Sequence, residues 1–228
     1  MPRLARIIAP GLPHHITQRG NYRQDVFDDD NDRRRYLIWM DEYSRKYNLL
    51  IIAYCLMSNH VHFIVIPSDK DSIARTFNTA HMRYSQYHNN KMGTAGHLWQ
   101  GRFFSCVMDE KHLTAAARYI ERNPVRAHIA KKAYDHVWSS AKDHVDNTHT
   151  SVIDSSELFK YVDIEQVKWK SFINAPDNTE DVSTIRKYTM TGRPLGGESF
   201  INKLEKEFGE RLHALPVGRP KRVEGGKK

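Results

Sequence analysis

Two histidines separated by a single residue, His60 and His62, are the first residues whose type and spacing suggest chemistry. Residues 60–66 form a predicted buried strand, because the other members of this run are β-branched or aromatic. Side chains alternate across a strand, so both imidazoles project from one face, about 6 to 7 Å apart at roughly 3.3 Å per residue. Two imidazoles at that separation can bind one metal ion.

The strand that carries the histidines has a partner directly before it in the chain. Residues 49–56 are an apolar run with strand character, and Ser58-Asn59 between the two runs has the chemistry of a turn. The two runs therefore predict a β-hairpin, which is a rigid support for a metal site.

The order of the other elements predicts the fold around this hairpin. We expect a strand at residues 14–19, a helix from about 28 to 47, a helix from 72 to about 87, a strand over 99–108 and a helix over about 110–122. This order is typical of the split-βαβ, ferredoxin-like fold. The predicted class is therefore α+β, with an antiparallel sheet in which the first strand and the histidine strand are central.

The last of these helices places two further polar residues together. Its apolar stripe includes Leu113 and Ile120, and Tyr119 and Asn123 lie one turn apart on the shoulder of that stripe. Pro124 ends or breaks the helix there. Asn123 has an alternative role as the N-cap of a following helix, and the alternative for Tyr119 is packing in the core.

The composition favours a polyanionic partner. The chain has 35 lysines and arginines against 27 acidic residues, a formal net charge of +8, which makes nucleic acid the default candidate. The sequence shows neither a signal peptide nor a run of about 18 to 20 apolar residues, so we expect a cytoplasmic protein without a membrane span. Cys55 and Cys106 lie in apolar runs and are expected to be small buried hydrophobes rather than zinc ligands.

The sequence changes character beyond Trp138. A polar stretch at residues 146–151 divides a predicted domain of residues 1–145 from a C-terminal helical appendage of residues 146–228. The appendage contains a helical apolar pattern from Phe200 to Leu212 and ends in a basic tail. Such a tail either contacts DNA or is merely solvated, and the basic arm of residues 1–13 leaves the same two interpretations open.

Three motifs resemble one known enzyme family. They are MSNHVH at residues 57–62, LWQGRF at residues 98–103 and YIERNPV at residues 119–125. Their combination is similar to the single-tyrosine HUH transposases, and within them to the REP-associated tyrosine transposases. The resemblance covers roughly residues 1–145, and GRPLG at residues 192–196 is also similar to that branch. Ser58 departs from the family, where proline is common, but it lies in the turn and leaves the histidines in place.

The resemblance implies an activity and a set of site residues. His60, His62 and Asn123 would bind Mg²⁺ or Mn²⁺, and Tyr119 would attack a phosphate of single-stranded or hairpin DNA. The products would be a 5′-phosphotyrosine and a free 3′-hydroxyl, so strand rejoining needs no nucleotide cofactor, in agreement with the absence of a P-loop motif. This branch is expected to work as a monomer, and a dimer that exchanges tyrosines stays open. The sequence identifies no general base for Tyr119.

Basic residues in the arm, the motifs and the tail are candidate DNA contacts. They are Arg3, Arg6, Arg19, Arg102, Arg193, Arg219, Lys221 and Arg222. Two other functions stay open: a DNA-binding regulator of the same fold that has lost catalysis, and a metallohydrolase that uses the histidines with Asp109 or Glu110. The complete set of four site residues argues against the first. The lack of a carboxylate-rich motif argues against the second.

Overall fold

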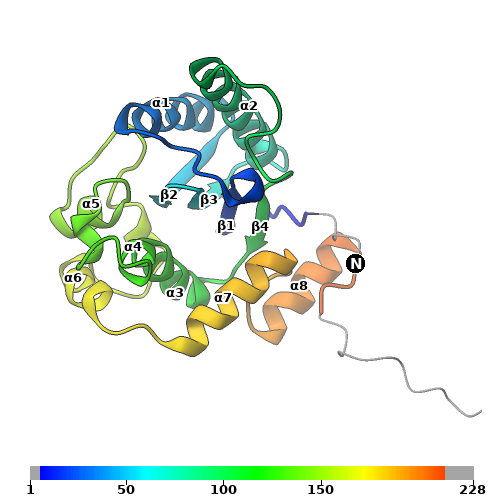
Figure 1. Cartoon of the computed structure of the whole chain (residues 1–228). Coiled ribbons are helices and arrows are strands. Elements are labelled where there is room, and N and C mark those ends of the chain that lie inside the picture. Colours follow the sequence, from blue (N-terminus) through cyan, green and yellow to red (C-terminus); the bar gives the residue numbers. More distant parts are fainter. Residues whose placement is uncertain (1–5, 214–228) are drawn as a thin grey trace, which may run out of the picture.

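The computed structural model describes residues 6–213 and places four strands in one antiparallel sheet (Figure 1). The strands are β1 (His14–Arg19), β2 (Leu49–Leu56), β3 (His60–Pro67) and β4 (Phe104–Val107), in the order β2-β3-β1-β4. β3 pairs with both β2 and β1, so His60 and His62 lie on a central strand. The predicted α+β, ferredoxin-like arrangement is confirmed.

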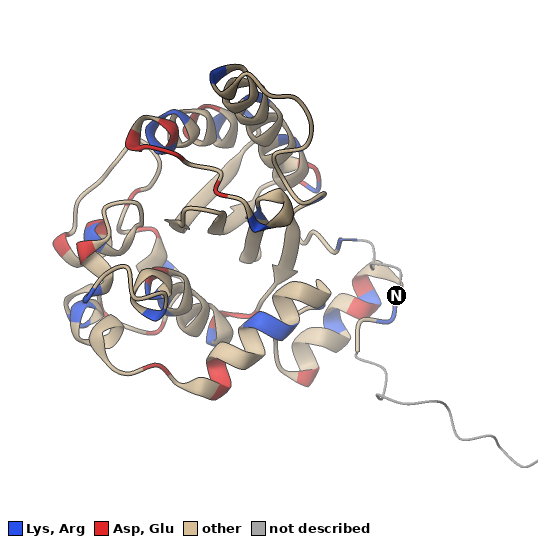
Figure 2. Cartoon of the chain, in the orientation of Figure 1, with Lys and Arg blue, Asp and Glu red and all other residues tan. Residues whose placement is uncertain are grey.

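Helices cover both faces of this sheet (Figure 1). α1 (Asp30–Lys46) and α2 (Ser72–Met92) pack together on one face. The other α-helices within residues 6–213 are α3 (Glu110–Glu121), α4 (Asn123–Arg126), α5 (Ala141–Asp146), α6 (Gln166–Asn174), α7 (Thr179–Thr191) and α8 (Glu198–Phe208). Short 3-10 helices span Asn21–Arg23, Ala133–Asp135 and Leu158–Lys160. Lysine, arginine, aspartate and glutamate residues lie mainly on the helices and loops around the sheet (Figure 2).

The ends of the elements follow local chemistry. α1 begins within the predicted acidic run, where the Asp29 side chain accepts from the backbone of Asp32 and the Asp32 side chain accepts in return. Two elements are shorter than predicted. β4 begins only at Phe104, because the preceding residues form a loop in which Gly101 has a φ of 83°. α8 ends at Phe208, because Gly209 caps it with a φ of 68°.

One hydrophobic cluster lies on each face of the sheet. On the α1 and α2 face it includes Phe63 and Tyr84. On the opposite face Leu113 of α3 shares a cluster with Trp169 of α6 and Ile185 of α7. Residues on both sides of the proposed boundary at 145/146 therefore share one hydrophobic core.

The cysteines lie in the core, as predicted. Cys55 and Cys106 are both buried and free. Burial raises the pKa of the Cys106 thiol to about 12, so this thiol stays protonated at neutral pH.

No helix within residues 6–213 is both long and apolar enough to cross a membrane.

Candidate active site

The structure brings the four predicted site residues around one pocket of about 320 Å³. His60 and His62 come from β3, Tyr119 comes from α3, and Asn123 is the first residue of α4. The pocket lies on the sheet face that α3 covers, opposite α1 and α2. Residues far apart in the sequence therefore meet at one site because β3 is central and α3 packs across it.

His60 is held in one tautomer by its neighbour in the chain. Its Nδ1 lies 2.6 Å from Oδ1 of Asn59, and an amide oxygen only accepts hydrogen bonds. Nδ1 therefore carries the proton, and Nε2 presents its lone pair toward the pocket. The side-chain nitrogen of Asn123 donates to that Nε2 at 3.2 Å. Asn123 thus contacts His60, and it is the first residue of α4, whose N-cap is Arg122.

His62 belongs to a chain of three buried side chains. Its Nδ1 lies 2.9 Å from Nε2 of His15, whose Nδ1 lies 2.8 Å from Oγ1 of Thr189 on α7. If His62 Nδ1 donates, then His15 Nε2 accepts and His15 Nδ1 must donate to Thr189. In that state Nε2 of His62 has a free lone pair beside His60, whose ring centre lies 5.1 Å from that of His62.

Burial keeps these histidines neutral. Burial, together with the smaller effect of the nearby charge of Arg19, lowers the pKa of His60 to about 4. The same cause lowers the pKa of His15 to about 3 and moves that of His62 well below its usual value. Metal ligation requires the neutral imidazole, so no proton has to be displaced at neutral pH.

Tyr119 both packs in the core and reaches the pocket. It is only 7% exposed and packs in the apolar cluster of α3, yet it also lines the pocket. Its ring stands edge-on to that of His62, with 5.9 Å between centres. The guanidinium of Arg126 lies 4.2 Å from the ring centre, and Nε of Arg186 donates to the hydroxyl at 3.4 Å. Two cations therefore flank the phenol.

The donor set fits a divalent ion. Two neutral imidazole nitrogens and the amide oxygen of Asn123, once that amide is rotated, supply three ligands and leave positions open for oxygen atoms of a substrate. Within residues 6–213 no group of three histidine, cysteine, aspartate or glutamate side chains is placed to bind a metal. A site here would therefore depend on the amide as its third protein ligand.

The candidate DNA contacts fall in different surroundings. Arg19 is exposed and lines the pocket beside His60. Arg102 lines a different pocket on the other face of the sheet. Arg3, Arg219, Lys221 and Arg222 lie outside the described residues.

Two further candidates make contacts within the chain. Arg6 donates to the carbonyl of Phe103 and lies 3.8 Å above its ring. Arg193 donates to the carbonyls of Leu212 and His213, both at 2.7 Å, and so holds the segment that follows α8. These contacts give both arginines a structural role.

His15, Arg186 and Thr189 are site residues that the sequence analysis missed. Strand alternation in β1 places His15 on the same face as Arg19, and this local signal was available in the sequence. Arg186 and Thr189 lie on α7, and no local pattern relates that helix to β1. Their position became visible only with the packing of α7 against β1 and β4.

Comparison with protein families identifies the class. A family model described as IS200-like transposase matches residues 10–123, which is half of the chain. The chain belongs to the IS200-like transposase family. This membership confirms the resemblance that the three motifs predicted and gives the chain the role of a DNA transposase. No curated protein matches the sequence.

Solved structures are similar to the chain in fold. A REP-associated tyrosine transposase bound to a REP hairpin matches with a TM-score of 0.52 and 19% identity, covering 67% of this chain and 90% of the other. A proposed transposase from Deinococcus radiodurans R1 matches with a TM-score of 0.37 and 16% identity, covering 56% of this chain and 92% of the other. The first likeness confirms the fold, and the second is too distant to add to it.

Proposed function

We propose that this IS200-like transposase cleaves and rejoins single-stranded DNA through a covalent bond to Tyr119 and depends on a divalent metal. The observation that carries the proposal is the meeting of His60, His62, Asn123 and Tyr119 at one pocket. A divalent ion there, Mg²⁺ or Mn²⁺, would withdraw electron density from the scissile phosphate. The REP hairpin bound by the structurally similar transposase makes hairpin-forming repeats the first substrate to test.

The reaction makes one bond at phosphorus and breaks another. The hydroxyl oxygen of Tyr119 attacks the phosphorus and loses its proton, the bond to the 3′-oxygen breaks, and that oxygen takes up a proton. The products are a 5′-phosphotyrosine and a 3′-hydroxyl. Attack by a 3′-hydroxyl on the phosphotyrosine reverses these steps and rejoins the strand without a nucleotide cofactor.

The side chains around Tyr119 support this role. The N–H of Arg186 donates to the Tyr119 hydroxyl, so a positive charge lies beside this oxygen when it loses its proton for attack and when it leaves phosphorus during rejoining. Asn59 holds His60 in the tautomer that ligation needs, and the contact with His15 allows the same tautomer at His62. Tyr119 and the histidines of the same chain share the pocket, which favours cleavage in cis by a monomer.

The two alternative functions would require other arrangements of side chains around the histidines. A metallohydrolase would need Asp109 or Glu110 at the histidines, but Asp109 caps α3 and accepts from the backbone of Gly197. Neither carboxylate lines the pocket. A regulator without catalysis would need none of the hydrogen bonds that orient His60 and His62. The geometry therefore supports the transposase over both.

The deciding experiment is analysis of a covalent adduct. We expect the chain, incubated with hairpin DNA and Mg²⁺ or Mn²⁺, to yield a peptide that carries DNA on Tyr119 in mass spectrometry. Tyr119→Phe removes one oxygen and little packing volume, so it should fold and bind DNA but form no adduct. Tyr134→Phe is the matched control and should form adduct like the unaltered chain.

Three other results would contradict the proposal. DNA attached to another tyrosine would mean that the wrong helix has been assigned. Cleavage without any adduct would indicate a hydrolase that uses water. DNA binding without cleavage in either metal would indicate a regulator.

A further inference from the structure

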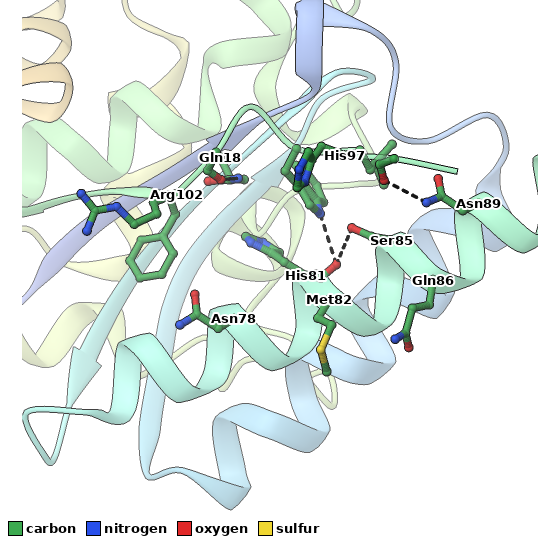
Figure 3. Close-up of a pocket in the computed structure, with 14 residues that line it drawn as sticks. Gln18, Asn78, His81, Met82, Ser85, Gln86, Asn89, His97 and Arg102 are labelled. Carbon is green, nitrogen blue, oxygen red and sulfur yellow. Dashed lines mark hydrogen bonds between the residues drawn. The ribbon is translucent and has the colours of Figure 1, made fainter. Parts of the chain in front are cut away.

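A second pocket lies on the opposite side of β1 from the candidate active site. Its volume is about 500 Å³, compared with about 320 Å³ for the pocket at His60 and Tyr119. One wall is α2 and the other is the segment of residues 96–103, as Figure 3 shows. A cavity of this size is within the range of sites that bind small organic groups.

The strand β1 contributes side chains to both pockets. Gln18 lines the second pocket, whereas its neighbours Thr17 and Arg19 line the active-site pocket. This follows from the alternation of side chains along a strand. β1 ends at Arg19, and Gly20 then bridges to Trp99 in the wall of the second pocket. A polynucleotide that passes this end of β1 is within reach of both pockets.

Four of the side chains that line the second pocket are amides, beside the polar side chains of His81, Ser85, His97 and Arg102. The amides come from Gln18, Asn78, Gln86 and Asn89. A carboxamide presents a donor and an acceptor side by side, which is the pattern that the edge of a nucleobase matches. None of the described lining residues is an aspartate or a glutamate, and Arg102 adds a positive charge at one end (Figure 3). The lining therefore suits a polar, uncharged group attached to an anionic chain.

The floor of the pocket is fixed by its own contacts. The rings of His81 and Trp99 lie 4.6 Å apart, and the indole N–H donates to the carbonyl of His81 at 3.3 Å. Burial lowers the pKa of His81 to about 3, so its ring is neutral. The side-chain nitrogen of Gln18 donates to the carbonyl of Gly101 at 2.8 Å. A fixed floor reduces the loss of freedom when a ligand binds.

The α2 wall offers apolar and polar groups together. Asn78, Met82 and Gln86 follow one another at intervals of about one turn along α2, and all three line the pocket. The side chain of Met82 is an exposed apolar group between two amides. This combination suits a flat heterocycle, whose face contacts the thioether while its edge bonds the amides. A bare phosphate would need more cations, and an apolar ligand would leave the amides unpaired.

We infer that this pocket binds one unpaired nucleobase of the DNA substrate while the phosphate to be cleaved lies across β1 at Tyr119. The inference rests on the proposed function for the identity of the polymer. Asn78 and Gln86 contact the edge of the base, and Arg102 contacts a phosphate beside it. The pocket thus selects where along the unpaired strand cleavage occurs.

The test asks whether one base of the DNA and the side chains of Asn78 and Gln86 contribute to the same contact. Affinity is measured by fluorescence anisotropy in EDTA, where no cleavage takes place, with hairpin oligonucleotides that carry unpaired 5′ and 3′ extensions. Each unpaired nucleotide is replaced in turn by an abasic analogue, and one position should weaken binding about ten- to hundredfold. The double variant Asn78→Ala/Gln86→Ala should weaken binding of intact DNA by a similar factor. In that variant the sensitive abasic position should add no further loss, because its contact is already absent.

Asn90→Ala is the matched control, because Asn90 lies on the same helix outside the pocket lining. It should keep both the affinity and the abasic sensitivity, and thermal unfolding should show that all variants fold. If the losses of affinity caused by the abasic substitution and by the double variant multiply, the inference is overturned. It is also overturned if no abasic position weakens binding. A weakening that is equal for every oligonucleotide and disappears at high salt would indicate phosphate contacts alone and would also overturn it.

The adduct on Tyr119 is measured separately and keeps the two proposals apart. Adduct formation without coupling between base and side chains would overturn the base pocket alone. Coupling without an adduct would support the base pocket and overturn the proposed cleavage.

Discussion

β1 presents different chemistry on its two faces. Toward α1 and α2, Ile16 lies in an apolar cluster with aromatic partners such as Phe63 and Tyr84. Toward α3 and α7, His15 takes part in a chain of hydrogen bonds that ends at the candidate metal ligand His62. Both sets of side chains are buried, but the first is held by packing and the second by directed polar contacts.

The difference predicts different responses to mutation. An apolar cluster tolerates changes that conserve volume and loses stability when a cavity forms. A buried hydrogen-bond chain needs every member, because a donor left without an acceptor costs about 1–3 kcal/mol. Changes on the α1 and α2 face should therefore reduce stability first, and changes on the α3 and α7 face should reduce chemistry first.

The largest contrast should come from two residues of β3. Phe63→Ala should lower the free energy of unfolding by about 3–5 kcal/mol, because Phe63 is fully buried among aromatic rings. His60→Ala should abolish adduct formation while leaving the fold and most of the DNA affinity, which phosphate contacts supply. Urea unfolding, anisotropy with hairpin DNA and adduct analysis would measure the three quantities for both variants.

Either of two results would break this contrast. His60→Ala with full cleavage in Mg²⁺ would remove the histidine pair from the site. Phe63→Ala with unchanged unfolding and lost cleavage would mean that the α1 and α2 face has a direct part in the chemistry.

The sequence was sufficient for the parts of the site that local periodicity determines. Alternation along β3 put His60 and His62 on one face, and helical phase put Tyr119 beside Asn123. It was insufficient wherever a contact joins distant segments. The approach of Thr189 to His15 depends on how α7 packs, and neither residue has a neighbour in sequence that signals the other. The length of β4 was overestimated because apolar loop residues before Phe104 share the composition of a strand.

A change at Thr189 tests whether α7 belongs to the active site. Thr189→Val removes the hydroxyl and keeps the shape, so His15 loses the partner of its Nδ1 and is free to adopt the other tautomer. His15 would then donate to Nδ1 of His62, and the proton on His62 would move to the nitrogen that should bind the metal. We expect the affinity for Mn²⁺, measured by electron paramagnetic resonance, to fall about ten- to hundredfold.

Two variants complete this test. Thr189→Ser restores the hydroxyl and should recover most of the Mn²⁺ affinity. Thr191→Val alters an exposed threonine of the same helix, whose hydroxyl bonds only the backbone of α7, and should leave the affinity unchanged. Equal Mn²⁺ affinity for Thr189→Val and the unaltered chain would show that the hydrogen-bond chain is structural only.

The smallest expected effect concerns Arg186, because it is exposed and its bond to Tyr119 is long at 3.4 Å. One hydrogen bond contributes about 0.5–1.5 kcal/mol, so Arg186→Gln should slow adduct formation about three- to tenfold. Lys187→Gln removes the same charge from the next residue, which does not line the pocket, and should leave the rate unchanged. Rates are compared in single-turnover experiments at saturating DNA, so that weaker binding does not contribute. If both variants slow the reaction equally, the effect of Arg186 comes from the general positive charge of α7 near the bound DNA, and its contact with the tyrosine hydroxyl has no part in it.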